Sequence, residues 1–136
     1  MRKTISILGS TGSIGLNVFE IINKKKFFFK VNLLSANKNY KLICSQIDKY
    51  KPNIFVISDP LVYKKIKTKY KNKKVKIINN FDSIKTKPKT DITITAIPGL
   101  AGLSPTIFMT ELSKKLLIAN KESIICGWKL IKNNAK

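Results

Sequence analysis

Apolar and polar positions along the chain follow two alternating periods, one typical of buried strands and one typical of amphipathic helices. The strand-like runs are residues 4–8, 31–35, 54–57, 75–78, 91–97 and 116–119. The helical runs are residues 14–24, 40–50, 60–70 and 105–114. Strands that alternate with helices form a parallel sheet covered on both faces and joined by right-handed crossovers. The pattern predicts a doubly wound α/β fold with a mainly parallel sheet of about six or seven strands.

A glycine-rich turn joins the first predicted strand to the first predicted helix. Gly9, Gly12 and Gly15 are spaced by three, which differs from the more familiar G-x-G-x-x-G order. Glycines at a strand-to-helix turn let the backbone approach a pyrophosphate, while the N–H groups of the helix's first turn face the anion. An ordinary tight turn is the alternative. Combined with the predicted sheet, the turn favours a Rossmann-like dinucleotide site. Further donors are expected from three hydroxyl side chains, Ser10, Thr11 and Ser13.

Three other polar or glycine-containing segments follow predicted strands, at residues 36–39, 98–102 and 120–122. Because the carboxyl ends of parallel strands meet at one edge of a sheet, these segments and the glycine turn are expected to lie together. Residues 36–39, Ala-Asn-Lys-Asn, hold no acid of the kind that binds the ribose 2′-hydroxyl of NAD. Lys38 suits a 2′-phosphate and so favours NADP, although it is also one lysine among 26.

The segment from Asn120 to Ser123 places an amide, an ammonium, a carboxylate and a hydroxyl side by side. Such a set is costly near a core unless a ligand or mutual pairing satisfies it. A helix start, with Asn120 as the cap and Glu122 in the first turn, explains the same residues equally well. Both interpretations stay open on the residues alone.

Composition limits the possible functions. The chain has 136 residues, enough for one domain, and a net charge of +20. Of its 27 basic residues only Arg2 is an arginine, and lysine, isoleucine and asparagine are abundant together, which is typical of coding bias in an AT-rich genome. We therefore expect no nucleic-acid partner. With no apolar run long enough to span a membrane and no signal-like N-terminus, we expect a cytoplasmic protein with no membrane partner.

Several kinds of catalytic site are excluded. The sequence has no histidine, so it holds neither a Ser-His-Asp triad nor a histidine-ligated metal. Cys44 and Cys126 form no C-x-x-C pair and are expected to be small buried residues of a reducing compartment. The seven acids are too few and too scattered for a hard divalent cation. No metal site is expected within the chain.

Four motifs together resemble one enzyme family: G-S-T-G-S-I-G at 9–15, A-N-K-N at 36–39, G-L-A-G-L-S-P-T at 99–106 and L-I-A-N-K-E-S at 117–123. Their order and spacing are similar to the N-terminal NADPH-binding domain of 1-deoxy-D-xylulose 5-phosphate reductoisomerases. The resemblance implies an enzyme that converts this sugar phosphate to 2-C-methyl-D-erythritol 4-phosphate in non-mevalonate isoprenoid biosynthesis. It implies NADPH, a divalent cation (Mn²⁺, Mg²⁺ or Co²⁺) and a homodimer for the intact enzyme.

The resemblance also implies roles for particular residues. Those implied at the pyrophosphate are Thr11, Gly12, Ser13 and Ile14, and those at the adenosine 2′-phosphate are Lys38 and Asn39. Asn120 and Glu122 are implied on the nicotinamide side, and Lys121 is implied as a substrate contact. Asn37 is expected among the cofactor-binding residues as well. Asn37 departs from the family pattern, which has glycine there, but asparagine tolerates positive φ better than most residues. Pro98 and Leu100 replace smaller residues of the family.

The same resemblance predicts how the chain is organised. Residues 1–130 are expected to form the NADP-binding domain, and residues 131–136 to begin a linker to a catalytic domain that is absent here. The family's metal ligands and substrate-phosphate residues lie in that domain, so no complete catalytic set is expected and the chain alone is expected to be inactive. The alternative is a truncated, non-catalytic module that binds a dinucleotide.

Overall fold

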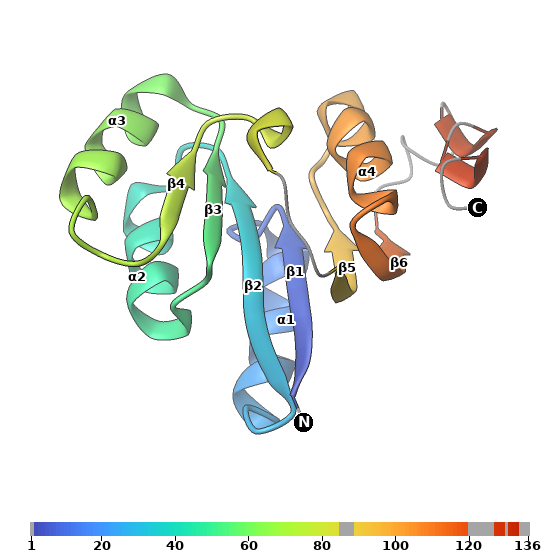
Figure 1. Ribbon diagram of the computed structural model, residues 1–136, viewed down its shortest axis with the longest axis horizontal. Helices are drawn as coiled ribbons and strands as arrows, with labels where there is room; N and C mark the ends of the chain where they lie inside the picture. The colour runs from blue at the N-terminus through green and yellow to red at the C-terminus, as the bar shows by residue number, and fades with distance from the viewer. Residues whose placement is uncertain (1, 85–88, 120–126, 130, 134–136) are drawn as a thin grey trace.

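The computed structural model describes residues 2–84, 89–119, 127–129 and 131–133. Within these ranges the chain forms a six-stranded parallel sheet with helices on both faces (Figure 1). The strands are β1 (Lys3–Leu8), β2 (Phe29–Ala36), β3 (Ile54–Ile57), β4 (Lys76–Ile78), β5 (Thr90–Thr95) and β6 (Ser113–Ile118). The helices are α1 (Ser13–Lys24), α2 (Tyr40–Tyr50), α3 (Pro60–Lys69) and α4 (Leu103–Thr110), with short 3-10 turns η1 (Phe81–Ser83) and η2 (Leu100–Gly102). Residues 127–129 and 131–133 are also helical.

The order of strands in the sheet is β4-β3-β2-β1-β5-β6. The chain therefore moves outward from β1 to β4 and then returns to the other side of β1 for β5 and β6. Both neighbours of β1 pair with it in parallel. This confirms the predicted doubly wound parallel sheet, and it puts the change of direction beside β1, where such sheets bind ligands at their carboxyl edge.

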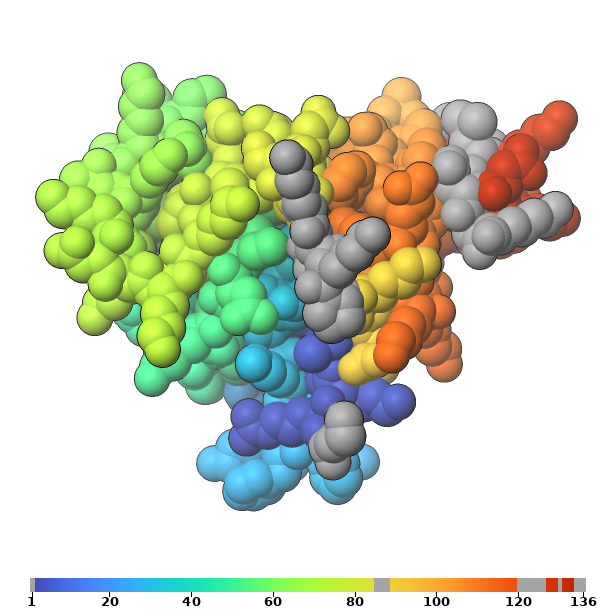
Figure 2. Space-filling model, in the orientation of Figure 1, coloured from blue at the N-terminus to red at the C-terminus, as the bar shows by residue number. Residues whose placement is uncertain are grey.

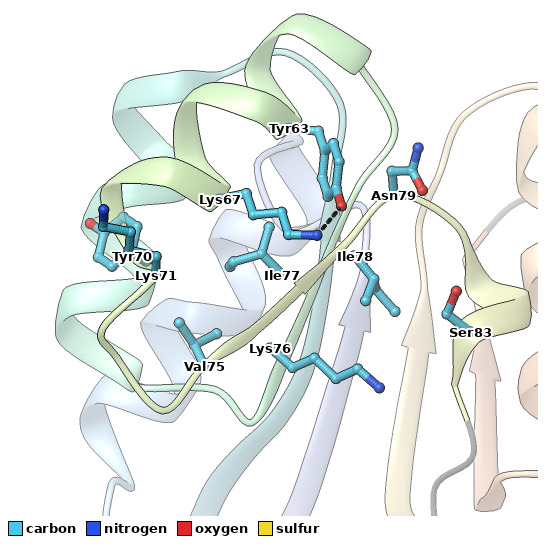
Figure 3. A pocket seen from close by; sticks show the side chains of 10 residues that line it. All are labelled: Tyr63, Lys67, Tyr70, Lys71, Val75, Lys76, Ile77, Ile78, Asn79 and Ser83. Atoms are coloured by element: carbon cyan, nitrogen blue, oxygen red, sulfur yellow. Dashed lines mark hydrogen bonds between the residues drawn. The ribbon is translucent and has the colours of Figure 1, made fainter.

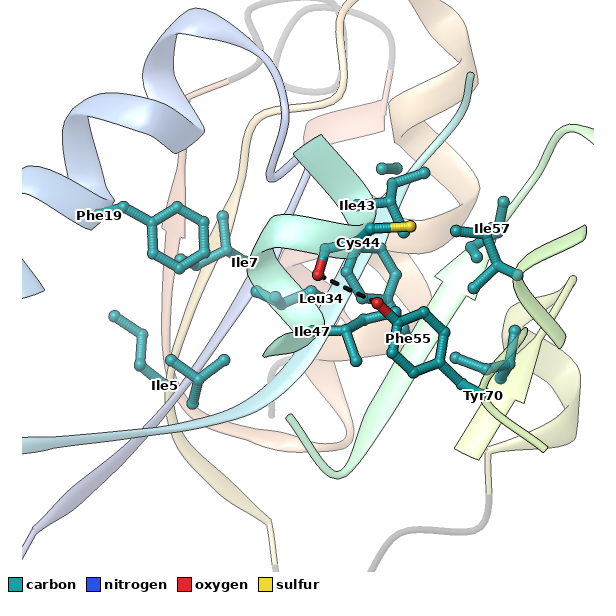
Figure 4. Close-up of a cluster of buried hydrophobic side chains, with 14 of the residues drawn as sticks. Ile5, Ile7, Phe19, Leu34, Ile43, Cys44, Ile47, Phe55, Ile57 and Tyr70 are labelled. Carbon is teal, nitrogen blue, oxygen red and sulfur yellow. Dashed lines mark hydrogen bonds between the residues drawn. The ribbon is translucent and has the colours of Figure 1, made fainter. Parts of the chain in front are cut away.

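Successive residues of the inner strands face opposite layers, as the period of a strand requires. Ile7 of β1 and Phe55 of β3 pack into the cluster beneath α1, α2 and α3 (Figure 4). Their neighbours Leu8 and Val56 pack into a second cluster with Met109 of α4. Because both faces of these strands are buried, they are apolar along their whole length rather than alternating with polar residues.

The buried face of α1 differs from the predicted one. Sequence spacing predicts an apolar face formed by Ile14, Val18, Ile21 and Ile22, yet Ile14 and Ile21 are 40% and 56% exposed. Ile22 is buried as predicted. Phe19, which was not predicted for this face, is also buried, and its ring stacks on Tyr50 of α2 with centroids 4.3 Å apart. The helix is apolar on more than one side, so packing of the larger aromatic ring decides which side is buried.

The last predicted helix is too long by several residues. It was expected to run to Lys114, but α4 ends at Thr110 and β6 begins at Ser113. Ser113 is buried beside β5, where its Oγ and the Oγ1 of Thr93 share a hydrogen bond of 2.6 Å, and Lys114 reaches Asp91. These contacts across the sheet override a local pattern that fits a helix.

A buried hydroxyl links α2 to the end of α3. The Tyr70 hydroxyl donates to Asp48 Oδ1 at 3.0 Å and approaches the Cys44 carbonyl at 3.3 Å. Burial and the neighbouring carboxylate raise the pKa of Tyr70 above its usual value, so the phenol stays protonated. Cys44 is a buried free thiol, as predicted. Cys126 lies outside the described residues.

Asp91 connects three strands at the amino edge of the sheet. Its Oδ2 accepts from the backbone N–H of Thr4 at 2.9 Å and from the Thr4 hydroxyl at 3.1 Å, while its Oδ1 pairs with Lys114 Nζ at 3.2 Å. The backbone hydrogen bond from Thr4, followed by the Lys114 contact, lowers the pKa of Asp91. The carboxylate therefore joins β1, β5 and β6 in its charged form.

Asp91→Asn should lower the free energy of unfolding at neutral pH, because the amide loses the charge that these donors favour. The folded-state pKa is depressed, so the stabilisation is present above the ordinary value of 3.8 and disappears as pH falls through the lower folded value. Urea unfolding of both proteins at neutral pH and well below pH 3.8 measures this difference. The exposed Asp82→Asn serves as the control, and an equal loss of stability in the two variants would contradict the assignment.

Candidate functional site

A cavity of about 340 Å³ opens at the carboxyl edge of the sheet, between the glycine turn after β1 and the loop after β5. It coincides with the point where strand order reverses. The residues around it come from the ends of β1, β2, β3 and β5 and the turns that follow them, from η1 and from the start of α4: Gly9, Thr11, Gly12, Ser35, Ala36, Asn37, Val56, Ser58, Phe81, Ala96, Ile97, Pro98, Ala101 and Pro105. Three of the four segments expected at one edge are thus brought together.

Two glycines of the turn are needed by the fold itself. Gly9 has φ +82°, and a Cβ there would lie 2.7 Å from the carbonyl oxygen of Ala96. A Cβ on Gly15 would lie 2.5 Å from the carbonyl oxygen of Gly9. Both distances are shorter than real Cβ contacts. Gly9 therefore lets the β1 turn pack on the end of β5, and Gly15 lets α1 start directly against the turn.

Gly12 is different, because nothing in the described part of the chain requires it to be glycine. Its φ of −81° and ψ of 175° are open to any residue, and a Cβ would make only an ordinary contact of 3.6 Å with the Gly9 carbonyl oxygen. Gly12 is exposed beside the cavity and precedes the first turn of α1. The small residue at this position leaves room for a ligand to approach the backbone.

The helices differ in how their N-termini are capped. Asn39 caps α2 by accepting from the N–H of Leu42, and Asp59 caps α3 by accepting from the N–H of Val62. No side chain caps α1 or α4, which begin after Gly12 and Gly102. The first turn of α1, with exposed Ser13 and Ile14, thus presents backbone N–H groups and a positive helix end toward the cavity side.

Ser10 is not the exposed donor that the sequence predicts. Its hydroxyl is fully buried and donates to Gln46 Oε1 at 2.7 Å, while Gln46 Nε2 donates back to the Ser10 carbonyl at 2.9 Å. This reciprocal pair fixes the glycine turn to α2. Sequence reasoning missed Gln46, whose one signal is its place as a polar residue between Ile43 and Ile47 on the buried face of α2. Thr11 and Ser13 remain accessible.

The segment after β2 presents amides and one ammonium. Asn37 Oδ1 accepts from the Ser58 hydroxyl at 2.9 Å, which ties this turn to the end of β3. Among the described non-glycine residues only Lys51 has positive φ, so Asn37 does not need the strained backbone that a glycine would permit. Lys38 is exposed, and Asn39, although it caps α2, is exposed as well. The only acid that follows the neighbouring strand β3 directly, Asp59, is occupied in capping α3.

The opposite wall of the cavity is mainly apolar. Pro98 lines it from the loop after β5, Ala101 from η2 and Pro105 from the first turn of α4, and Phe81 lines it from η1. Gly99, with φ +73°, makes the turn that leads into η2. The cavity thus has a polar side, formed by the glycine turn and the segment after β2, and an apolar side suited to an aromatic ring.

A second cavity, of about 480 Å³, lies between α3 and the free edge of β4 (Figure 3). Lys67 donates to the Tyr63 hydroxyl at 2.9 Å in its upper wall, and Lys71, Lys76 and Ser83 stand around it. None of the residues predicted for the site lines this cavity. Its place at an edge strand, away from the reversal in strand order, separates it from the candidate site.

The described ranges lack two further features. They contain no group of three or more Cys, Asp or Glu side chains that could hold a metal ion, and none of their acids lines the 340 Å³ cavity. No helix in these ranges is both long and apolar enough to cross a membrane. The predicted nicotinamide-side and substrate residues, Asn120, Lys121 and Glu122, lie outside the described residues.

Comparison with known proteins agrees with the geometry. The family model described as 1-deoxy-D-xylulose 5-phosphate reductoisomerase matches residues 5–127. The enzyme of that name from Pelagibacter ubique is 43% identical over 98% of this chain, which spans 36% of the relative. The enzyme of that name from Wolbachia pipientis wMel is 38% identical over 98% of this chain, which spans 35% of that relative. The chain therefore spans about a third of the length of these relatives.

Solved structures give the same result. The reductoisomerase of Zymomonas mobilis in complex with NADPH superposes with a TM-score of 0.87 at 29% identity, covering 98% of this chain and 36% of that one. A DOX-P reductoisomerase complex with NADPH, fosmidomycin and magnesium superposes with a TM-score of 0.88 at 26% identity, over 98% of this chain and 34% of that one. The parallel sheet, the glycine turn and these matches together show that the chain belongs to the 1-deoxy-D-xylulose 5-phosphate reductoisomerase family.

Proposed function

We propose that this chain binds NADPH and serves as the cofactor domain of an enzyme that converts 1-deoxy-D-xylulose 5-phosphate to 2-C-methyl-D-erythritol 4-phosphate. The observation that carries the proposal is the open approach to Gly12, in front of the uncapped first turn of α1. A backbone that is free of side chains, next to a positive helix end, fits a pyrophosphate. The family and the NADPH complexes of its members support the same cofactor.

Each accessible residue of the site then has a definite part in binding. Thr11 and Ser13 supply hydroxyl donors, and Gly12 and Ile14 supply backbone N–H groups to the pyrophosphate. Lys38 neutralises the 2′-phosphate. Asn37, through its amide nitrogen, and Asn39 add donors at the same phosphate, while Asn39 Oδ1 continues to cap α2.

The remaining roles belong to the carboxyl edge beyond β6. We assign Asn120 and Glu122 to the nicotinamide side and Lys121 to the sugar-phosphate substrate, since they follow β6 directly in sequence. NADPH, when bound, supplies the hydride for reduction. The chain's own contribution is to hold the dinucleotide across the switch between β1 and β5, so that its reactive end lies toward β6.

The other parts of the proposal concern the complete enzyme. Residues 1–130 form the cofactor domain, and residues 131–136 begin the connection to a catalytic domain. Ile131, the first residue of that connection, is 2% exposed. A divalent cation (Mn²⁺, Mg²⁺ or Co²⁺) binds in the catalytic domain, and the magnesium complexes of family members support a cation in the complete enzyme. We further propose that the complete enzyme is a cytoplasmic homodimer that binds its cofactor and a small sugar-phosphate substrate and does not bind nucleic acid.

Gly12→Val should abolish detectable NADPH binding while the fold stays intact, because the branched side chain fills the ligand's approach and its Cβ makes only an ordinary contact with the Gly9 carbonyl oxygen. Gly15→Ala is the matched control, since its Cβ meets the Gly9 carbonyl and should lower the melting temperature instead. Calorimetric titration and thermal unfolding separate the two effects. Normal NADPH binding by Gly12→Val would show that the glycine serves only the turn.

The chain should bind NADPH more tightly than NADH, because Lys38 is accessible and no acid stands in the segment after β2. Lys38→Ala should weaken NADPH binding about tenfold, or about 1.4 kcal/mol, and leave NADH binding nearly unchanged. Lys74→Ala, in the exposed α3–β4 turn, is the control. At about 100 times the Kd, a ligand stabilises the fold by about 2.7 kcal/mol, so melting curves report both affinities. Equal stabilisation by NADH and NADPH would contradict the preference.

A polypeptide of these 136 residues should not oxidise NADPH when given 1-deoxy-D-xylulose 5-phosphate and Mn²⁺. A hard divalent cation needs several converging oxygen ligands, and the described residues supply no such group. Absorbance of NADPH measures turnover, with the Gly12→Val variant as a control for contaminating host enzyme. Turnover by the chain that Gly12→Val abolishes would contradict this expectation. NADPH binding without turnover, even when the catalytic domain of a relative is added, would instead favour a non-catalytic binding module.

A further inference from the structure

The turn between α1 and β2 exposes two phenylalanines at one end of the molecule. Phe27 is 76% exposed and Phe28 is 64% exposed, although each is a large apolar side chain. The turn projects beyond the rest of the structure, next to the start of β1 (Figure 1; Figure 2). Its backbone is well fixed, since Lys3 donates to the Phe28 carbonyl at 2.8 Å and Phe28 donates to the Lys25 carbonyl at 2.9 Å. The two rings are therefore held outward by an ordered turn.

Positive charge surrounds these rings. The ammonium of Lys26 lies 5.7 Å from the centroid of the Phe27 ring. Six exposed cations flank the pair in sequence and across the start of the sheet: Arg2, Lys3, Lys24, Lys25, Lys26 and Lys30. The nearest acid along α1 is Glu20, and the Asp91 carboxylate close to Thr4 is already engaged by Thr4 and Lys114. We call Phe27, Phe28 and these six cations the basic aromatic tip.

We propose that the basic aromatic tip docks the protein on an anionic lipid surface, with Phe27 and Phe28 inserted among the headgroups. Apolar rings that enter the interface and cations that attract acidic headgroups are the two components of peripheral membrane binding. The tip lies at the amino edge of the sheet, because it joins the starts of β1 and β2. The cofactor cavity lies at the opposite edge and stays open to solvent.

A bilayer suits the tip better than the other possible partners. A second copy of this chain would bring its own cations against the first, which opposes association. Single-stranded nucleic acid also combines cations with stacking, but the fixed turn offers two adjacent rings and no groove to follow a backbone. The proposal revises the expectation of no membrane partner, which rests on the lack of a spanning segment and a signal-like N-terminus and not on the surface of the protein. It does not depend on the cofactor assignment.

Vesicle flotation tests the proposal on the full 136-residue chain. It should float with phosphatidylcholine vesicles that contain phosphatidylglycerol, not with pure phosphatidylcholine, and added salt should weaken the binding. The double variant F27S/F28S should bind these vesicles at least about tenfold more weakly than the unmodified chain, because insertion of the two rings is lost. L61S is the matched control, since Leu61 is 71% exposed elsewhere. Far-UV circular dichroism spectra and melting temperatures equal to those of the unmodified chain would show that the variants fold.

A charge-matched pair distinguishes the tip from diffuse attraction. K25E/K26E should lose most of the binding, whereas K73E/K74E, which changes the net charge equally in the exposed α3–β4 turn, should lose much less. Equal losses would overturn the proposal in favour of non-specific attraction. The proposal would also be overturned if F27S/F28S bound vesicles as well as the unmodified chain does. If the chain bound single-stranded RNA through Phe27 and did not bind vesicles, the tip would be a nucleic-acid site instead. If F27S/F28S dissociated a dimer, the tip would be an interface between two copies of the chain.

Discussion

The site depends on one close contact, the approach of the Gly9 backbone to the Ala96 carbonyl. With φ +82° and no Cβ, Gly9 lets the turn after β1 lie directly on the end of β5. Any side chain at this position would separate the two connections that form the cavity. The pairing of β1 with β5 brings their ends together, but the missing side chain determines how closely they meet. The geometry of the ligand site is thus set by sterics within the sheet edge before any ligand group is considered.

A polar pair then holds this turn in place from the other side. Ser10 and Gln46 exchange two hydrogen bonds in a buried position, so neither can be removed without leaving the other unsatisfied. α2, which supplies Gln46, is itself capped by Asn39 at the end of the segment that carries Lys38. The same helix therefore positions both the glycine turn and the segment after β2. Rigid support of this kind keeps a binding site preorganised, so that less free energy is spent on ordering when a ligand binds.

Much of the architecture could be predicted from the sequence, for physical reasons that also explain the errors. Runs such as residues 54–57 are apolar because both faces of an inner strand are buried, and that signal is local. The buried face of α1 was mispredicted at Ile14 and Ile21, since several apolar faces compete and only packing on Tyr50 selects one. Ser113 was placed in a helix because its partner Thr93 is distant in sequence. The three glycines looked equivalent, and only the structure separates Gly12 from Gly9 and Gly15. Ser10 looked like a donor to a ligand, because a sequence does not reveal that Gln46 occupies it.

Several of the described acids stabilise the fold, and none of the described acids lines the cavity. Asp48 accepts from Tyr70, Asp59 caps α3 and Asp91 joins three strands, so these carboxylates are used in holding the fold. None of the described acids faces the cavity, whose polar side offers donors only from backbone, hydroxyls and amides, with Lys38 exposed in the segment after β2. Because no described acid lines this surface, it favours the phosphates of a dinucleotide and does not repel their negative charge. The described lining also includes no carboxylate that could hold a cation or transfer a proton. In the described part of the chain, Asp48, Asp59 and Asp91 thus stabilise the fold, and the edge of the sheet around the cavity is left to hydrogen-bond donors and one exposed ammonium.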